Sequence, residues 1–115
     1  MAQKTFPEFS VVEAGRGAAS EPEPGLTRRL GAYNDKLFLV EHHMQAGWAG
    51  ARHSHMHDQV VYVVKGHLRV CVAQTTFEVG QGDSFVVRGG VEHQAWAVAD
   101  SVVVDVFTPM REDYL

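Results

Sequence analysis

Apolar and polar residues alternate along most of this chain with the two-residue period that is typical of β-strands. In residues 36–44, KLFLVEHHM, the alternation places Phe38, Val40 and His42 on one side of the strand. No window of helical length shows a competing helical period. Further strands, separated by Gly-rich turns, are predicted over residues 26–33, 59–64, 67–73, 75–79, 84–88, 93–98 and 101–107. This spacing predicts an all-β fold, an antiparallel sandwich or barrel whose alternate residues face the interior.

The N-terminal part of the chain lacks this regularity. Residues 1–12 are expected to supply a short edge strand, whereas residues 13–25, EAGRGAASEPEPG, have the Gly, Pro, Glu and Ser content of a loop. We therefore expect an N-terminal strand and a flexible loop over residues 1–25, followed by a barrel over residues 26–115. A chain of 115 residues is long enough for one domain with its own core.

Charge and composition exclude several classes of partner. The formal charge is −4 and the basic residues are scattered, which argues against a nucleic-acid surface. The sequence shows neither a signal peptide nor a long apolar run, so we expect no membrane partner. The single cysteine, Cys71, lies in the alternating run HLRVCVA and is expected to be a small buried hydrophobe. A lone cysteine also fits a reducing compartment, and we expect a cytoplasmic protein.

The most informative stretch runs from Gly47 to Gly66 and contains three alternating histidines. His53, His55 and His57 are followed by Gln59 and an apolar run. Imidazole is costly to bury unless its ring nitrogens have partners, and a divalent metal can partner several imidazoles at once. The stretch therefore predicts part of a metal site.

The spacing of this stretch resembles the first signature of the cupin superfamily, and a second signature follows it. The second consists of Gly82, Arg88, Gly90 and His93. Gln59 stands where many cupins have Glu, Arg88 where a proline is usual, and Ala97 where an asparagine is common. The resemblance implies a small RmlC-like cupin, with the double-stranded β-helix or jelly-roll barrel of that group. It also implies a metal site whose ligands are His53, His55, Gln59 and His93.

The ligand spacing has a physical basis. Residues two apart in an extended strand share a face, so His53 and His55 can both point inward, and Gln59 can return to that face. His57 shares the alternation, but a bend near Met56 is expected to turn it aside. The other histidines, His42, His43 and His67, are expected at the surface or the barrel rim.

The predicted donor set suits catalysis by one divalent transition metal. Three imidazoles and one side-chain oxygen leave open positions for water or substrate. The neutral amide of Gln59 leaves the full positive charge on the ion, which favours Lewis-acid chemistry and attracts anions. Nickel, manganese, zinc and iron(II) all accept such donors, so the identity of the metal stays open.

The C-terminal stretch SVVVDVFTPMREDYL adds further candidates. On a strand, Val103, Asp105 and Phe107 share one face, which would place a carboxylate in an apolar interior, where it can act as a general acid or base. Arg111 lies where its planar fork could clamp a substrate carboxylate at the barrel mouth. The alternative is that Asp105 is a surface residue of an edge strand and pairs with Arg111.

The run from Thr27 to Leu115 is similar to the cupins that linearise unsaturated uronates from pectin or alginate breakdown. The segments HSHMHDQVVYVVKG, QGDSFVVRGGVEH and DVFTPMREDYL carry this similarity, although Met56 and Asp58 replace a more usual Pro and Glu. The similarity implies that Asp105 and Arg111 are catalytic and that Phe107 and Arg111 bind substrate. It also implies metal-dependent ring opening and ketonisation of 4,5-unsaturated uronates to linear keto-uronates.

Two other functions fit the same residues. One is a metal-dependent dioxygenase or a polyketide-cyclase-like cupin, and the other is a cupin that binds a small ligand without turning it over. In each case we expect a small anionic ligand. By analogy with other small cupins, we also expect a homodimer.

Overall fold

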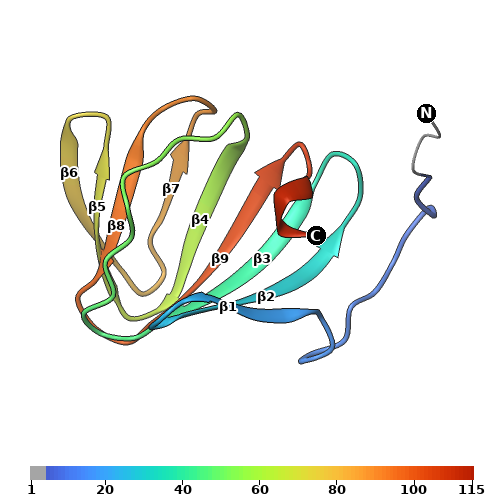
Figure 1. Ribbon diagram of the computed structural model, residues 1–115, viewed down its shortest axis with the longest axis horizontal. Coiled ribbons are helices and arrows are strands. Elements are labelled where there is room, and N and C mark those ends of the chain that lie inside the picture. Colours follow the sequence, from blue (N-terminus) through green and yellow to red (C-terminus); the bar gives the residue numbers. More distant parts are fainter. Residues whose placement is uncertain (1–4) are drawn as a thin grey trace.

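The protein folds into two antiparallel β-sheets that pack against each other, as a computed structural model of residues 5–115 shows (Figure 1). The larger sheet has the strand order β1-β2-β3-β9-β4-β7, and the smaller has the order β6-β5-β8. The predicted all-β jelly-roll barrel is confirmed. The strands are β1 (Ala19–Glu23), β2 (Leu26–Tyr33), β3 (Phe38–Met44), β4 (Asp58–Lys65), β5 (His67–Val72), β6 (Thr75–Gly80), β7 (Ser84–Val87), β8 (His93–Ala97) and β9 (Ser101–Thr108).

The alternation predicts the strands from β2 onward well because each of them buries inward-facing residues. In β3, Phe38, Val40, His42 and Met44 are buried, and the residues between them are exposed or half-buried. From β2 onward, the predicted ends differ from the observed ones by at most two residues. Turn residues such as Gly66, whose φ of 101° only glycine adopts readily, explain the sharp boundaries between the strands.

Two apolar clusters form the core, one between the sheets and one at the end of the larger sheet. The first consists of Leu26, Met44, Val61, Val63, Leu68, Val70, Val79, Ala97 and Val103. The second consists of Phe38, Val40, Phe107 and Met110. The two clusters share strands β3 and β9, and the inward positions of these strands that separate them carry the polar residues His42 and Asp105. The core therefore has a polar centre.

The segment between β3 and β4 lies alongside β8 and extends the smaller sheet. Figure 1 shows it crossing beside β8 before it enters β4. Ala49 pairs with Trp96, and His53 pairs with His93, both in antiparallel register. The backbone N–H of Gly50 donates to the carbonyl of Ala95 over 3.0 Å. This pairing fixes the histidine-rich stretch against a regular strand.

The N-terminal prediction was wrong in its details. No strand forms over residues 5–12, and residues 1–4 lie outside the described part of the chain. Strand β1 instead forms over residues 19–23, within the expected loop, and pairs with β2. The Pro and Glu content suggested a loop, but an edge strand tolerates proline because one row of its N–H groups faces away from the sheet.

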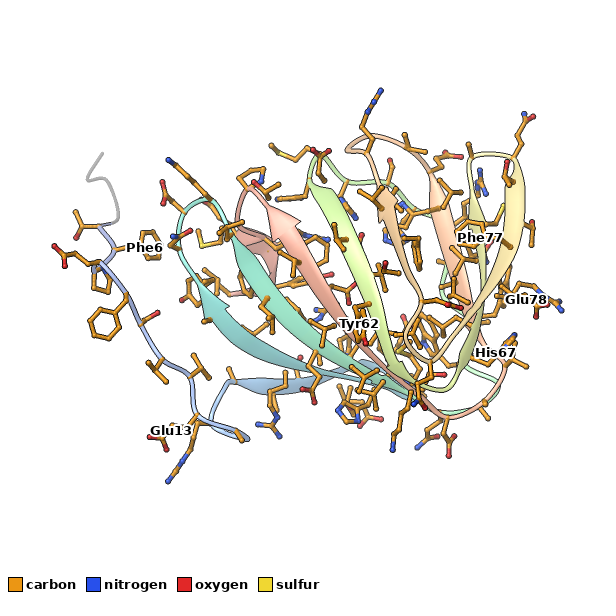
Figure 2. All side chains as sticks on the ribbon, turned by 180° about the vertical axis from the view of Figure 1, so that it is seen from behind. Phe6, Glu13, Tyr62, His67, Phe77 and Glu78 are labelled. Atoms are coloured by element: carbon orange, nitrogen blue, oxygen red, sulfur yellow. The ribbon has the colours of Figure 1, made fainter. Side chains whose placement is uncertain are left out.

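The outer face of the larger sheet carries exposed apolar residues. Val60, Tyr62, Val64 and Val86 are all exposed, and Figure 2 labels Tyr62 on β4. The predicted homodimer stays a prediction. Among residues 5–115, no helix is long and apolar enough to cross a bilayer.

The prediction for His67 agrees with the structure better than the prediction for Cys71. Cys71 is half-buried rather than buried, and its sulfur accepts a hydrogen bond from Nη1 of Arg52 over 3.5 Å. His67 lies at the rim as expected, where its ring contacts Glu78 at 3.0 Å (Figure 2).

Two neighbouring residues at the start of β3, one buried and one exposed, should differ greatly in how much their substitution destabilises the protein. Phe38→Ala removes a side chain with no exposed surface and should lower the free energy of unfolding by about 3–5 kcal/mol. Leu37→Ala, at a residue that is 55% exposed, should change it by less than about 0.5 kcal/mol. Urea denaturation measures both values, and equal losses would contradict the described burial.

Candidate active site

A cavity of about 320 Å³ opens between the two sheets. Its lining includes every site residue that the sequence singled out: His53, His55, Gln59, His93, Asp105, Phe107 and Arg111. Asp105 is only 3% exposed, and β9 lies inside the larger sheet between β3 and β4. The alternative of a surface carboxylate on an edge strand is therefore wrong.

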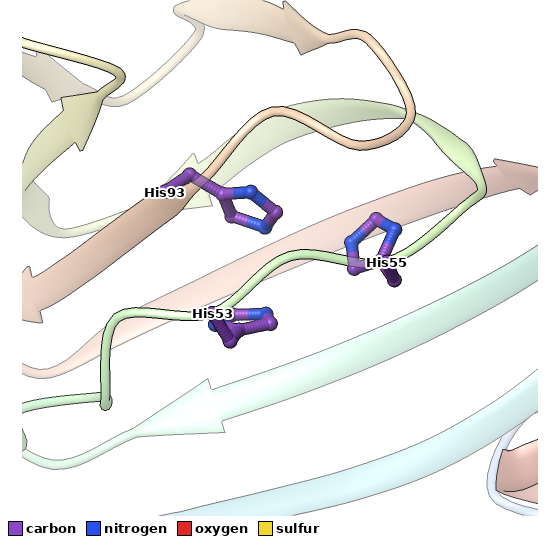
Figure 3. A group of neighbouring side chains, drawn as sticks. All are labelled: His53, His55 and His93. Atoms are coloured by element: carbon purple, nitrogen blue, oxygen red, sulfur yellow. The ribbon is translucent and has the colours of Figure 1, made fainter.

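Backbone pairing brings His53 and His93 together. The two residues exchange both hydrogen bonds, His53 N–H to His93 O over 3.0 Å and His93 N–H to His53 O over 2.8 Å. Directly opposed residues of an antiparallel pair project to the same face, and the two imidazole centroids are 4.4 Å apart. His55, two residues further on, completes the group in Figure 3, as the alternation predicts.

Two of these imidazoles are oriented by backbone carbonyls. Nδ1 of His53 lies 3.0 Å from the carbonyl of Ala51, and Nδ1 of His93 lies 2.9 Å from that of Val91. A carbonyl only accepts, so Nδ1 carries the proton in both rings, and Nε2 keeps a lone pair for a metal. The ligand atoms of the three histidines lie within 4.8 Å of one another. The three imidazoles are therefore grouped closely enough to be the residues that would hold one ion.

His55 and Gln59 provide an independent test of whether a cation fits. Nε2 of His55 lies 2.9 Å from Oε1 of Gln59, and Nδ1 of His55 is buried without a hydrogen-bond partner. A neutral imidazole has one N–H and one lone pair, so either tautomer leaves an acceptor without a donor. A bound cation would satisfy that acceptor. The residues present therefore fit a divalent metal, with His53, His55, His93 and Gln59 as the residues that would hold it.

Burial also prepares two of the imidazoles for metal binding. It lowers the pKa of His55, with the Arg111 guanidinium as a second cause. Burial is the main cause that lowers the pKa of His93 as well. A lowered pKa favours the neutral ring, which is the form that binds metal ions.

A tight bend excludes His57 from the cluster, as the sequence predicted. The chain bends at Met56 and His57, and His57 is buried outside the three-histidine group. The backbone N–H of Gly89 donates to Oδ1 of Asp58 over 2.7 Å and holds the bend. A Cβ atom at Gly89 would lie 2.1 Å from the carbonyl oxygen of Met56, so only glycine fits there.

Both oxygens of the buried Asp105 carboxylate accept hydrogen bonds from side chains. Nε2 of Gln59 donates to Oδ1 over 2.7 Å, and Nδ1 of His42 contacts Oδ2 over 2.7 Å. Because a carboxylate only accepts, the amide nitrogen of Gln59 must face Asp105, and its oxygen faces His55. Asp105 thus orients the oxygen that Gln59 would offer to a metal.

The structure corrects the prediction for His42, which is buried rather than at the surface or rim. It is 8% exposed and lines the cavity next to Asp105. Nε of Arg28 donates to Nε2 of His42 over 3.0 Å. Arginine only donates, so Nε2 keeps its lone pair and the proton of the neutral ring lies on Nδ1, facing Asp105.

The C-terminal segment closes one side of the cavity. Its short 3-10 helix, Glu112–Tyr114, places the Tyr114 ring against two guanidiniums, with Arg28 Cζ at 3.6 Å and Arg111 Cζ at 4.1 Å from the ring centroid. The Arg111 guanidinium also lies 4.9 Å from the ring centroid of Phe107. Phe107 is 1% exposed and forms a wall of the site.

Arg111 does not pair with Asp105 but with Asp113. Nε of Arg111 donates to one carboxylate oxygen of Asp113 over 2.9 Å, and Nη2 donates to the other over 2.6 Å. These hydrogen bonds are the main cause that lowers the pKa of Asp113. The fork that the sequence assigned to a substrate carboxylate is therefore occupied by a neighbour in the chain.

The sequence reasoning missed Arg28, His42 and Tyr114 as residues of the cavity. A signal existed for the first two. Arg28 lies two residues after the inward-facing Leu26, and His42 alternates with the inward-facing Phe38 and Val40, so each lies on the inner face of its strand. No comparable signal existed for Tyr114, which follows the last strand.

The cluster predicts one divalent ion per chain. Loss of a hydrogen-bond partner of a metal ligand lowers metal affinity on the order of 10- to 100-fold. His93→Ala removes a direct donor instead, so it should weaken binding of the ion by more than this. His57→Ala, in the same stretch but outside the cluster, should retain the ion. Metal content after gel filtration measures both, and equal loss in the two folded variants would contradict the assignment.

Tyr114 allows a separate test by pH. Burial raises the pKa of its phenol and outweighs the opposing effect of the two guanidiniums. The unfolded chain releases this proton near pH 10 and the folded chain does not, so the contribution of Tyr114 to stability is lost as pH rises above about 10. Alkaline absorbance titration of wild type minus Tyr114→Phe should give a midpoint above 10, and a midpoint at or below 10 would refute this.

The chain is similar to known proteins over most of its length. The chain is 30% identical over 93 residues to the "Pectin degradation protein KdgF" of Dickeya dadantii. The aligned residues cover 79% of this chain and 84% of that protein. The solved structure of KdgF from Halomonas sp. is 33% identical with a TM-score of 0.87, covering 92% of this chain and 98% of that one. An RmlC-like cupin from Shewanella frigidimarina is 32% identical with a TM-score of 0.86, covering 96% and 97%.

The family model described as "Cupin domain" matches residues 40–107, from the middle of β3 to the end of the inward face of β9. The match includes both signature segments and all three clustered histidines. It therefore spans much of the cavity lining, whereas Arg28, Arg111 and Tyr114 lie outside it. The chain belongs to the cupin family.

Proposed function

We propose that this protein, with a divalent transition metal bound, opens and ketonises 4,5-unsaturated uronate monosaccharides to linear keto-uronates. The observation that carries the proposal is the buried Asp105 carboxylate, which lies in the same cavity as the three-histidine cluster and is hydrogen-bonded to Gln59. The similarity to KdgF, named for pectin degradation, supports this substrate class. The cavity volume of about 320 Å³ lies at the low end of the range of about 300–1,000 Å³ for small-molecule sites. It suits a monosaccharide better than a polymer.

The reaction is an isomerisation that moves a proton and needs no oxidant. The hydroxyl on the anomeric carbon loses its proton, and the bond between the anomeric carbon and the ring oxygen breaks. This gives an aldehyde and an enolate. The enolate then takes up a proton at carbon 4 and becomes a ketone at carbon 5, so atoms and electrons balance. A metal held by His53, His55, His93 and Gln59 would supply a Lewis acid that stabilises oxygen anions.

Asp105 is the residue that we assign to the proton transfers. Both of its oxygens accept hydrogen bonds, but each oxygen has a second lone pair that can take a proton from the substrate. Gln59 and His42 hold the carboxylate in one orientation, so the substrate finds the base in place. Arg28 and Arg111 both border the cavity, and because Asp113 pairs with Arg111, Arg28 supplies the positive charge for an acid sugar.

The cytoplasmic location and the homodimer that the sequence suggests belong to this proposal. The single half-buried cysteine supports a reducing compartment. The exposed apolar residues of β4 and β7, among them Val60, Tyr62 and Val86, support association through the outer face of the larger sheet.

The test is the loss of ultraviolet absorbance of an unsaturated galacturonate monomer. The metal-loaded wild type should remove this absorbance well above the spontaneous rate, and Asp105→Asn should lower kcat by about 10²- to 10⁴-fold because it removes the base. Asp100→Asn, on a distant loop, should retain full activity. Metal content is measured in every variant, since Asp105 also orients Gln59.

Other results would reject the proposal. A wild-type rate equal to the background with nickel, manganese, zinc and iron(II) would leave a cupin that binds without turnover. Oxygen consumption coupled to substrate loss would instead indicate a dioxygenase.

A further inference from the structure

Two guanidiniums border the cavity, but only one of them has a carboxylate partner. Asp113 binds Nε and Nη2 of Arg111 and neutralises its charge. Arg28 makes no ion pair with any described residue, and the one hydrogen bond that it donates runs from Nε to His42. Its Nη1 and Nη2 atoms remain available for a ligand. Arg28 is thus the unmatched positive charge of the cavity wall.

The structure holds this guanidinium in a fixed position. His42 lies directly opposite Arg28 in the pairing of β2 with β3, and it accepts from Nε over 3.0 Å. The face of the guanidinium lies over the Tyr114 ring at 3.6 Å. One edge and one face are therefore engaged, and the edge formed by Nη1 and Nη2 is the one left for a planar anion. A group held in this way loses little entropy when it binds.

Arg28 lies near Asp105 but does not pair with it. His42 separates the two, because it binds Arg28 through Nε2 and Asp105 through Nδ1 at 2.7 Å. An acid sugar brings a second negative charge into a cavity that already holds the Asp105 carboxylate. Arg28 can offset that charge, and the intervening imidazole keeps it from closing directly onto Asp105.

We propose that Arg28 binds the carboxylate of an acid sugar in a bidentate manner through Nη1 and Nη2, and that His42 and Tyr114 position it for this. The identity of the ligand as an acid sugar rests on the proposed function. The bidentate clamp that the sequence assigned to Arg111 is thereby assigned to Arg28, and the pair of Arg111 with Asp113 braces the wall formed by Phe107 and Tyr114.

The test compares an acid with its neutral ester. Galacturonate, which lacks the double bond and cannot react, and its methyl ester are titrated into metal-loaded protein by calorimetry. Wild type should bind the acid more tightly than the ester. Arg28→Gln should weaken binding of the acid by about 10- to 100-fold, the loss typical of a charged hydrogen-bonded pair, and change binding of the ester little.

Three further variants sharpen the comparison. Arg29→Gln removes a positive charge from the same strand, but Arg29 binds the carbonyls of Gly15 and Gly17 outside the cavity, so binding of both probes should be unchanged. Arg28→Lys restores the charge without the fork and should recover binding of the acid only in part. Arg111→Gln should affect acid and ester alike. Melting temperature and metal content confirm that each variant is folded and loaded.

Several outcomes would overturn the proposal. They are a wild type that does not distinguish acid from ester, an equal loss for both probes in Arg28→Gln, and an acid-selective loss in Arg111→Gln instead. The proposed function is tested separately by turnover. If wild type binds galacturonate through Arg28 but does not turn over the unsaturated uronate, the reaction is wrong and the binding site stands. If Arg28→Gln turns over the uronate with an unchanged KM, the binding site is wrong and the reaction stands.

Discussion

The buried carboxylate of Asp105 is the group on which the rest of the site depends. An isolated carboxylate in an apolar interior would cost several kcal/mol, on the order of the desolvation penalty for a single ion, so it must be hydrogen-bonded. Gln59 and His42 provide one hydrogen bond to each oxygen. Each of these residues is in turn fixed at its other end, Gln59 by His55 and His42 by Arg28. One buried charge therefore organises a continuous chain from the metal ligands to the opposite wall.

The sheet supplies the rigid frame for this chain. The apolar cluster between the sheets and the cluster around Phe38 and Phe107 lie on either side of the polar centre and anchor β3 and β9. The segment before β4 is held just as firmly, because it pairs with β8 over several backbone hydrogen bonds. Functional groups on packed strands are positioned more accurately than groups on loops, and here the clustered histidines gain the same advantage by strand-like pairing.

The sequence predicted the barrel and the placement of the site through one property, which is the alternation of inward and outward side chains along a strand. This alternation placed His53 and His55 on one face, and Asp105 on the same face as Val103 and Phe107. The structure confirms both placements. The same alternation placed His42 beside Phe38 and Val40, yet it was expected at the surface or rim because it lies outside the histidine motif. Its partners, Arg28 and Asp105, come from neighbouring strands, and a single sequence does not reveal which strands become neighbours.

Partner choice limited the sequence reasoning in the C-terminal segment as well. An arginine six residues after Asp105 suggested either a pair with it or a clamp for substrate, but Asp113, two residues further on, takes the fork. A local contact of this kind costs little loop entropy and competes well with a contact across the cavity. The prediction for the N-terminal segment was wrong for a different reason. Its composition described the chain as a loop, whereas the open edge of β2 offered hydrogen bonds that outweighed the composition.

The departure of Gln59 from the more usual Glu now has a physical explanation. Oδ1 of Asp105 lies 2.7 Å from the amide nitrogen of Gln59, so a glutamate there would bring two acceptor-only carboxylates into contact. The buried carboxylate of Asp105 is therefore matched by a neutral side chain at residue 59. A metal held by three imidazoles and an amide would keep its full charge, and Arg28 leaves one positive charge on the wall. An acidic protein of net charge −4 thus keeps a cavity that attracts anions.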